Sequence, residues 1–302
     1  MNEENGSSPG RRSGTVAVIG RPNAGKSTLV NTLVGQKIAI VSDKPQTTRR
    51  RILGIRTAPE GQIVFVDTPG LHKPLHRLNR VMLAESIEAM REVDVRLLVI
   101  DASVPSGGGD RYTFDLLAKE EPPRIALLNK TDRIEKRVLL PRMAQLGELG
   151  IFDEIVPVSA LRGDGLDMLV PLLYRYLPGG DDLFPEGTVT TTGQPVRIAE
   201  IIREKFLERT REEIPYGLGV VIDDIARDDA KNLTVVMATV VVDKDNHRKI
   251  VLGSGGRMIR DSGTAARMEL EKTFGGRFFL DLNVRSRPGW REDPQFLSTL
   301  TS

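Results

Sequence analysis

The 302-residue chain contains no cysteine, which excludes disulfide bonds, thiolate nucleophiles and cysteine-ligated zinc sites. Long hydrophobic runs are also missing, since none approaches the roughly 20 residues that a membrane-spanning helix needs. An excess of charge of one sign is missing as well, because the net charge is only +2. Any surface that binds nucleic acid must therefore be local.

The composition is otherwise typical of a globular protein, with 39% hydrophobic and 28% charged residues. The length is sufficient for one large domain or two smaller ones. Residues 1–14 are polar and carry Arg11 and Arg12 without an apolar segment behind them, which is not the pattern of a secretory signal. We predict a disordered lead-in there.

A glycine-rich stretch near the N-terminus matches a phosphate-binding loop. It follows an apolar run, residues 15–19, that predicts a buried strand, and it precedes residues 28–34, whose apolar spacing predicts a helix. In this context G-x-x-x-x-G-K-[ST] binds phosphate through backbone N–H groups and the positive end of the helix, with the lysine on the β- and γ-phosphates and the serine on Mg²⁺. The stretch consists of Gly20, Arg21, Pro22, Asn23, Ala24, Gly25, Lys26 and Ser27.

A second phosphate motif follows two predicted strands, residues 52–55 and 63–66, that are joined as a hairpin. It consists of Asp67, Thr68, Pro69 and Gly70. Behind a phosphate loop, an aspartate in this place reaches Mg²⁺ and the glycine N–H faces the γ-phosphate. The next residue, Leu71, completes this predicted nucleotide-binding segment. Its side chain cannot orient water by hydrogen bonding, so we predict slow intrinsic hydrolysis.

A third motif selects the base. The apolar run 125–128 predicts a strand that leads into Asn129, Lys130, Thr131 and Asp132. A fixed carboxylate at Asp132 accepts hydrogen bonds from N1–H and the 2-amino group of guanine, whereas adenine would leave that charge without a donor. Another predicted strand, 155–158, leads to Ser159, Ala160 and Leu161, which are placed to approach guanine O6 with backbone N–H groups. The motifs together predict a guanine-nucleotide site.

Strands alternate with helices throughout this part of the chain, with further helices predicted over 78–92 and 165–177 and a strand over 96–100. This alternation predicts an α/β fold with a doubly wound, mostly parallel sheet. Ligands of such sheets bind at the carboxyl ends of the strands, where all of these motifs fall.

Taken in order, GRPNAGKS, PQTTR, DTPG, NKTD and SAL look like the five G-motifs of translation-factor-related GTPases. The longer stretches GRPNAGKSTLVNTLVGQKIAIVSDKPQTTRRRILGI and DTPGLHKP, with IREK at 202–205 and IPY at 214–216, closely resemble the Era family of bacterial GTPases. The resemblance extends from about residue 15 to 292 and implies an N-terminal P-loop GTPase domain followed by an α+β type II KH domain. We expect a GTPase domain over 15–178, a linker over 179–194 and a KH domain over 195–302.

The second half has the element order of a KH domain when it is analysed by itself. We predict a helix over 196–211, strands over 217–226 and 233–242, a helix from Arg248, a G-x-x-G turn, a helix over 257–274 and a strand over 277–284. Such a turn clamps the backbone of about four single-stranded nucleotides. Residues 247–287 include nine basic and four acidic side chains, a locally positive patch. The predicted RNA-binding residues are Arg248, Lys249, Gly253, Ser254, Gly255, Gly256, Arg257 and Arg260.

One detail departs from the family pattern. Era proteins usually carry a lysine or arginine inside the G-x-x-G turn, whereas this chain has Ser254 and Gly255 there. The clamp would then depend on backbone N–H groups together with Arg257 and Arg260.

The resemblance also implies how the nucleotide acts as a switch. Mg²⁺ would be held by Ser27, Asp67 and Thr48, with Thr47 as the alternative to Thr48, and the basic loop over 36–51 would be ordered only while the γ-phosphate is present. The predicted catalytic residues are Asn23, Lys26, Thr48, Asp67 and Gly70. Asn23 would help to hold K⁺, as in related potassium-stimulated GTPases.

The resemblance implies partners as well. These are 16S ribosomal RNA near its 3′ end and the 30S subunit, which the protein would help to mature, acting as a monomer in the cytoplasm and partly at the inner face of the cell membrane. Two alternatives remain open. One is a constitutive RNA-binding scaffold with a structural nucleotide, which Leu71 favours, and the other is an ATPase, which Asp132 argues against.

Overall fold

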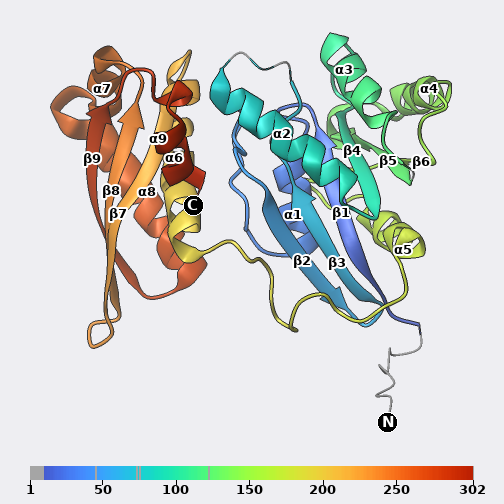
Figure 1. Cartoon of the computed structure of the whole chain (residues 1–302), viewed down its shortest axis with the longest axis horizontal. Coiled ribbons are helices and arrows are strands. Elements are labelled where there is room, and N and C mark those ends of the chain that lie inside the picture. Colours follow the sequence, from blue (N-terminus) through green and yellow to red (C-terminus); the bar gives the residue numbers. More distant parts are fainter. Residues whose placement is uncertain (1–9, 45, 73, 75, 122, 302) are drawn as a thin grey trace. The chain divides into compact units, whose positions relative to one another are not determined.

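The computed structural model describes residues 10–301 except Pro45, Lys73, Leu75 and Pro122. The chain divides into two compact units, and Figure 1 follows it through both of them. Apart from those four residues, the first unit contains 10–39, 48–73 and 82–191. The second unit contains 40–47, 74–81 and 192–301, so it includes two segments that precede the predicted KH domain in the sequence.

The first unit is built on a six-stranded sheet with the strand order β2-β3-β1-β4-β5-β6. Neighbouring strands are parallel except β2 and β3, which form the predicted antiparallel hairpin. The strands are β1 (Arg12–Gly20), β2 (Ile52–Ala58), β3 (Gly61–Asp67), β4 (Val95–Asp101), β5 (Arg124–Asn129) and β6 (Glu154–Pro157). The predicted doubly wound, mostly parallel sheet is confirmed.

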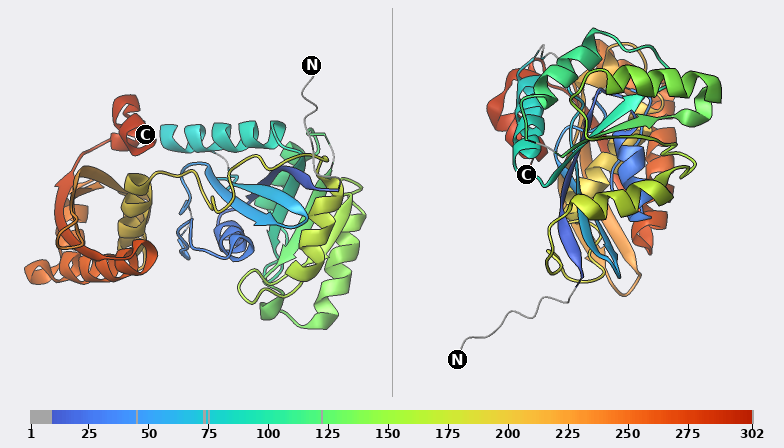
Figure 2. Two further views of the ribbon diagram at one scale, coloured as in Figure 1. Left: turned by 90° about the horizontal axis from the view of Figure 1, so that it is seen from below. Right: turned by 90° about the vertical axis from the view of Figure 1, so that its right-hand side faces the viewer.

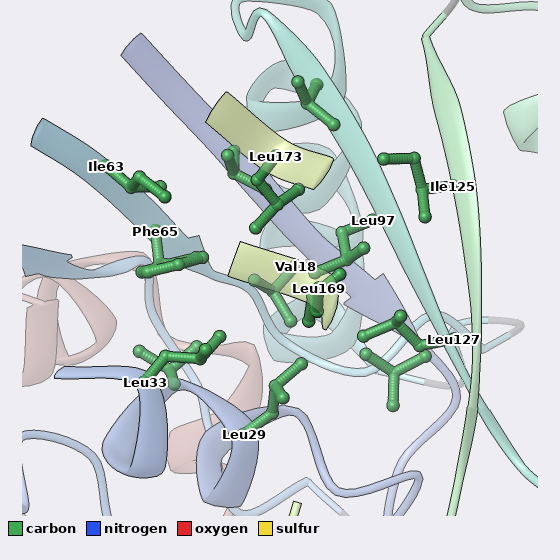
Figure 3. Close-up of a cluster of buried hydrophobic side chains, with 14 of the residues drawn as sticks. Val18, Leu29, Leu33, Ile63, Phe65, Leu97, Ile125, Leu127, Leu169 and Leu173 are labelled. Carbon is green, nitrogen blue, oxygen red and sulfur yellow. The ribbon is translucent and has the colours of Figure 1, made fainter. Parts of the chain in front are cut away.

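Helices cover both faces of this sheet, as Figure 1 shows. They are α1 (Lys26–Val34), α2 (Arg77–Arg91), α3 (Gly108–Leu117), α4 (Lys136–Gly147) and α5 (Leu166–Tyr176). Alternate side chains of β1 enter different cores, because successive residues of a strand point to opposite faces. Val18 belongs to a core with Leu29 and Leu173 (Figure 3), whereas Ile19 belongs to a second core with Leu117.

Two boundaries differ from the sequence-based expectation. β1 begins at Arg12, three residues before Thr15, because Arg12 pairs with Gly61 of β3; residues 1–9 of the predicted lead-in lie outside the described part. Much of the predicted linker over 179–194 is attached to the first unit. The Gln62 side chain exchanges two hydrogen bonds of 2.9 Å with the backbone of Phe184. Residues 179–191 of the predicted linker therefore belong to the first unit.

The second unit contains a three-stranded sheet with the order β7-β8-β9, in which β7 and β8 are antiparallel and β8 and β9 are parallel. Its elements are α6 (Gln194–Leu207), β7 (Leu218–Asp228), β8 (Leu233–Val242), α7 (Asp245–Leu252), α8 (Arg257–Phe274), β9 (Arg277–Ser286) and α9 (Pro294–Thr301). Figures 1 and 2 show α6 and α8 against one face of this sheet. Ile202 and Phe206 of α6, Val240 of β8 and Leu270 of α8 belong to its core. The predicted order of elements is confirmed.

Within the described residues, no helix is long and apolar enough to span a membrane.

Candidate functional site

The phosphate loop, residues 20–27, needs glycine at two positions. Gly20 has φ +145° and Gly25 has φ +100°, values that side chains with a Cβ rarely adopt. A Cβ at Gly20 would lie 2.3 Å from the Val99 carbonyl oxygen, and one at Gly25 would lie 2.3 Å from Asn129 Nδ2. Because α1 begins at Lys26, its first N–H groups lack partners within the helix and remain available to an anion.

Lys26 is a buried cation in this loop, with 6% of its surface exposed. Its Nζ donates to the carbonyl oxygens of Gly20 at 3.1 Å and Arg21 at 3.0 Å. Burial lowers the pKa of Lys26 to about 8, although the negative charge of Asp67 opposes this shift. A lysine in this position is suited to a phosphate anion, whose negative charge would stabilise the protonated side chain against the cost of burial.

The three predicted metal ligands come together beside Lys26. Ser27 Oγ donates to Asp67 Oδ2 at 2.7 Å and lies 2.9 Å from Thr48 Oγ1, which is itself 3.5 Å from Asp67 Oδ2. Asp67 is completely buried, and burial raises its pKa to about 6 despite the nearby charge of Lys26. Of the two threonines considered, Thr48 lies in this cluster, while the Thr47 hydroxyl donates to the Lys44 carbonyl at 2.6 Å.

This cluster fits Mg²⁺. Asp67 Oδ1 is buried and has no hydrogen-bond partner among the described residues, so it is an acceptor that an ion or its water could satisfy. The described part of the chain contains no group of three or more His, Asp or Glu that could hold a metal by itself. One carboxylate and two hydroxyls would therefore leave several positions of an octahedral ion to phosphate oxygens and water, as Mg²⁺ prefers.

The raised pKa of Asp67 predicts a pH-dependent affinity for Mg²⁺. Only the ionised carboxylate binds the ion, and with a pKa of about 6 most of Asp67 is ionised at pH 7 and little at pH 5. We expect the Mg²⁺ affinity of the nucleotide complex to fall about tenfold between these pH values, as measured by titration with Mg²⁺. The Asp67→Asn variant should retain only the pH dependence of the nucleotide phosphates, and an identical pH dependence in both proteins would contradict the assignment.

The D-x-x-G segment closes over the phosphate loop. A Cβ at Gly70 would lie 2.7 Å from the backbone nitrogen of Pro22, so glycine is required by this close approach. The Leu71 N–H donates to the Gly20 carbonyl at 3.0 Å. The Leu71 side chain is only 1% exposed and belongs to the same core as Ile19. Leu71 is therefore a packing residue that brings no hydrogen-bonding group to the nucleotide.

Asn129 joins the predicted base loop to the phosphate loop. Its Nδ2 donates to the Ala24 carbonyl at 2.8 Å, and its Oδ1 accepts the Ala160 N–H at 2.9 Å. Both interactions are buried. A single amide side chain thus joins the phosphate loop, the base loop and the 159–161 segment. The first and last of these are more than 100 residues apart in the sequence.

Asp132 is positioned by Ser159. The Ser159 hydroxyl donates to Asp132 Oδ1 at 2.6 Å, and this hydrogen bond is the main reason that the pKa of Asp132 is lowered. The carboxylate is accordingly ionised at neutral pH and retains acceptor capacity for the two donors of guanine. Leu161, in contrast, is 71% exposed.

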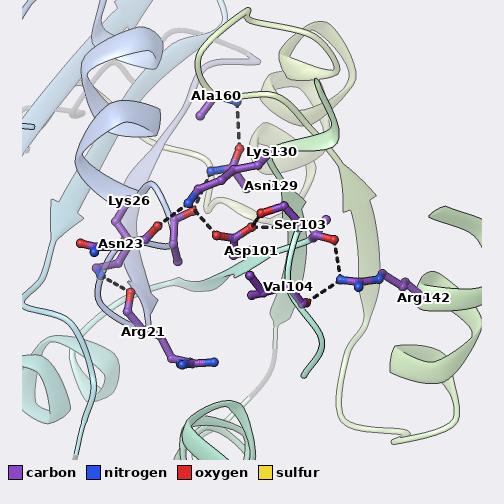
Figure 4. A network of polar contacts seen from close by, with 12 residues as sticks. Arg21, Asn23, Lys26, Asp101, Ser103, Val104, Asn129, Lys130, Arg142 and Ala160 are labelled. Atoms are coloured by element: carbon purple, nitrogen blue, oxygen red, sulfur yellow. Dashed lines mark hydrogen bonds and ion pairs between the residues drawn. The ribbon is translucent and has the colours of Figure 1, made fainter. Parts of the chain in front are cut away.

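The sequence motifs do not indicate the role of Asp101, at the end of β4. Its Oδ2 forms an ion pair with Lys130 Nζ at 2.6 Å, and Lys130 Nζ also donates to the Asn23 carbonyl at 2.7 Å (Figure 4). Burial alone would raise the pKa of Asp101, but the hydrogen bonds from Lys130 and Ser103 outweigh it and lower the pKa. An aspartate at the carboxyl end of a buried strand was the available signal, as it was for Asp67.

The glycine turn of the second unit lies between α7 and α8. Gly253, Gly255 and Gly256 have φ of +74°, +60° and +72°, so the chain reverses through left-handed conformations. A Cβ at Gly255 would meet no atom within 4 Å, which leaves the outer side of the turn open.

The predicted basic residues surround this turn. Lys249, Arg257 and Arg260 are exposed, and no hydrogen bond or ion pair of their side chains is found in the described part of the chain. Arg248 already makes one hydrogen bond within the unit, since its Nε donates to the Val284 carbonyl at 3.1 Å. Three exposed cations beside the open outer side of this turn form a surface suited to a phosphodiester chain.

The second unit also holds the segment 40–47, which directly precedes Thr48 in the sequence. Glu204 of α6 accepts the Val41 N–H at 2.8 Å, and Arg203 donates to the Thr47 carbonyl. Arg203 and Glu204 are each only 2% exposed. In the sequence they stand out only as part of the IREK stretch, and no role is predicted for them because a helical charge pair is usually solvated.

Two family models match this chain, one in each half. The family described as 50S ribosome-binding GTPase matches residues 15–130, and the KH domain family matches residues 213–291. GTPase Era of Geobacter metallireducens is 44% identical over 96% of this chain and 97% of its own length. GTPase Era of Syntrophus aciditrophicus is 43% identical over 95% and 94%.

Solved structures extend the similarity to the fold. A crystal structure of Era in complex with MgGDPNP and nucleotides 1506–1542 of 16S ribosomal RNA has a TM-score of 0.93 and 37% identity, covering 96% of this chain and 98% of that one. A crystal structure of an Aquifex aeolicus Era variant bound to GDP·AlF4⁻ has a TM-score of 0.92 with the same identity and coverage.

Fold and site together define a P-loop GTPase that carries a KH domain. A relative with 44% identity over nearly the whole chain specifies the family within that class. The chain belongs to the Era family of GTPases, as the sequence motifs predicted, and it is an enzyme that hydrolyses GTP.

Proposed function

We propose that this protein is a GTP-dependent switch that binds 16S ribosomal RNA near its 3′ end and acts in the assembly of the 30S subunit. The cluster of Ser27, Thr48 and the buried Asp67 carries the proposal, because it provides a Mg²⁺ site that depends on a residue from the 36–51 loop. The similar Era protein that was crystallised with MgGDPNP and a 16S fragment supports the choice of nucleotide, ion and RNA.

The residue roles follow from the contacts. Lys26 and the N–H groups of the phosphate loop would bind the β- and γ-phosphates, and Ser27, Thr48 and Asp67 would hold Mg²⁺, which supplies positive charge to the phosphates when bound. Asp132 would select guanine. The Gly70 N–H would face the γ-phosphate.

Hydrolysis without a partner should be slow, because the buried Leu71 side chain cannot orient the attacking water. K⁺ bound with the help of Asn23 would supply positive charge to the phosphates, which the Leu71 side chain cannot do. Asn23 adopts φ +63°, a conformation that asparagine tolerates better than most residues. The ratio of turnover in K⁺ to turnover in Na⁺ tests this role, since it should fall towards one in Asn23→Ala.

The second unit would act as the RNA clamp, with the KH domain over 195–302. Replacing both Arg257 and Arg260 by alanine should weaken binding of a labelled single-stranded RNA that carries the 16S 3′ sequence. If each arginine neutralises one phosphate, the slope of log K against log salt should become shallower by about 1.4. Fluorescence anisotropy over a range of salt concentrations measures this slope.

Arg227 provides the matched control, because it is an exposed arginine of β7 that is paired with Asp229. Arg227→Ala should leave both the affinity and the salt dependence unchanged. Equal slopes for the wild-type protein and the Arg257/Arg260 double variant would remove these residues from the RNA surface.

Nucleotide and RNA binding would be coupled through the segment 40–47. Its ends are held by Glu204 and Arg203 of α6, and its next residue in sequence is the predicted magnesium ligand Thr48. The competing function is a constitutive RNA scaffold, which predicts the same RNA affinity with every nucleotide.

The cellular setting is proposed from the family resemblance. The protein would act as a monomer in the cytoplasm, with part of it peripherally associated with the inner face of the cell membrane. Co-flotation with vesicles of anionic phospholipid tests the membrane association, and the sedimentation coefficient tests the oligomeric state.

A further inference from the structure

The first unit contains a pocket that the nucleotide-site residues do not line. It has a volume of about 740 Å³ and lies between α3 and α4, beside the carboxyl ends of β4 and β5. Ile100, Phe114, Leu128 and Leu146 make its inner wall apolar. A pocket of this size and lining is in the range of sites that bind ligands or anchor side chains of a partner.

The charged residues that line this pocket are all arginines. Arg111, Arg137 and Arg142 line it, and no carboxylate is among its lining residues. Arg137 pairs with the exposed Glu135 at 2.6 Å. Arg111 is exposed, and no partner of its guanidinium is found within the described ranges. The pocket therefore combines an apolar interior with a rim that attracts anions.

The α4 wall of the pocket is long enough for an elongated occupant. The lining residues of α4 run from Arg137 to Leu146, a length of roughly 14 Å at 1.5 Å per residue. At the mouth, Leu149 is 46% exposed, and Val104, next to the lining residue Pro105, is 44% exposed. Helical peptides that bind grooves of this length place apolar side chains at i, i+3, i+4 and i+7 inside the groove.

We propose that the α3–α4 pocket is a docking site for an acidic, amphipathic segment of a partner protein. Apolar side chains of that segment fill the space over Phe114 and Leu146, and its carboxylates pair with Arg111 and Arg142. Charge complementarity selects the sign of the segment, and the apolar wall supplies most of the area that it buries.

A chain of contacts connects this pocket to the guanine-recognition loop (Figure 4). Arg142 donates to the carbonyl oxygens of Ala102 and Val104. Asp101, the last residue of β4, directly precedes this loop and forms an ion pair with Lys130 at 2.6 Å. A carboxylate that pairs with Arg142 fixes this guanidinium on the loop and thereby fixes Lys130. Occupancy of the pocket consequently slows the release of GDP.

The test uses the full chain saturated with GDP and a phage library that displays random 16-residue peptides. Peptides rich in Glu or Asp with apolar residues at helical spacing should be enriched. Synthetic versions of these peptides should bind Arg111→Glu at least tenfold more weakly than the wild-type protein. They should bind Arg227→Glu, the same charge change on β7 of the second unit, as well as the wild type.

The functional readout is the release of a fluorescent GDP derivative. A saturating selected peptide should slow release by about fivefold, a coupling of typical size. Enrichment without acidic residues, or equal binding to Arg111→Glu and wild type, would overturn the docking site. If no acidic peptides are enriched, and a fluorescent fatty acid binds saturably to the wild type but not to Arg111→Glu, the pocket would be assigned to an anionic lipid instead. Unchanged GDP release with bound peptide would overturn the connection to the nucleotide.

Discussion

An Asp132→Asn variant is expected to bind xanthine nucleotides in preference to guanine nucleotides. In the wild type, Ser159 fixes one oxygen of Asp132 at 2.6 Å, and the lowered pKa keeps the carboxylate ionised for the N1–H and 2-amino groups of guanine. An asparagine still accepts from N1–H, but it presents an NH₂ group to the 2-amino group. The same NH₂ group complements the 2-oxo group of xanthine.

The loss for guanine should be large, because one charge-assisted hydrogen bond disappears and two donors oppose each other. At about 1.5–3 kcal/mol for each charged hydrogen bond, GDP affinity should fall at least about a hundredfold. Competition between fluorescent GDP and XDP measures the change. Asp164→Asn is the matched control, since Asp164 is an exposed carboxylate whose backbone carbonyl accepts the Ser159 N–H. Unchanged GDP binding by Asp132→Asn would contradict the base-recognition assignment.

A Lys26→Met variant is expected to lose nucleotide affinity while the nucleotide-free protein becomes more stable. Lys26 is the buried cation of the phosphate loop, so its removal leaves the phosphates without a charged donor. We expect at least a hundredfold weaker GTP binding, in line with about 3 kcal/mol for a charged hydrogen bond in a buried site. Isothermal titration with GTP and Mg²⁺ measures this loss.

The gain in stability follows from the lowered pKa. A change from 10.5 to about 8 corresponds to roughly 3 kcal/mol, and the two lost hydrogen bonds to backbone carbonyls offset about 2 kcal/mol of it. Because the pKa of Lys26 is lower in the folded protein, burial of its charge destabilises the fold by the full amount below pH 8. This destabilisation decreases as the pH rises from 8 to 10.5. The variant should therefore be about 1 kcal/mol more stable at pH 7, and this advantage should disappear above pH 8.

Denaturant unfolding of the nucleotide-free proteins at about pH 7 and about pH 9.5 gives both values. A variant that is less stable at neutral pH, or a difference from wild type that does not change with pH, would contradict the burial of a charged Lys26. With GTP present, the wild type should be more stable than Lys26→Met, since ligand binding adds to the free energy of unfolding.

The sequence predicted the elements whose residues carry their own local signal. The glycines of the phosphate loop and of the 253–256 turn mark left-handed backbone positions, and the apolar runs mark buried strands. The alternation of Val18 and Ile19 between two cores follows from the period of two residues in a strand.

The residues that escaped prediction act through long-range contacts. Asp101 pairs with Lys130 across neighbouring strands, and Gln62 fastens Phe184 of the predicted linker 122 residues later. Arg203 and Glu204 appear in the sequence as ordinary helical charges, and only the fold shows that they are buried against a loop 156 residues or more away. The burial of a charged side chain cannot be predicted from the residue type alone, because arginine and glutamate are both common on protein surfaces.

In the proposed switch, the bound nucleotide controls the affinity for RNA. The most direct measurement is the affinity of the full chain for a labelled single-stranded RNA with the 16S 3′ sequence, in the presence of Mg²⁺ with either GDP or a non-hydrolysable GTP analogue. Because Thr48 can bind Mg²⁺ beside the γ-phosphate while Arg203 and Glu204 hold the segment before it, we expect tighter binding with the analogue, by about five- to a hundredfold. Equal affinity with both nucleotides would contradict the switch and identify the protein as an RNA scaffold with a structural nucleotide.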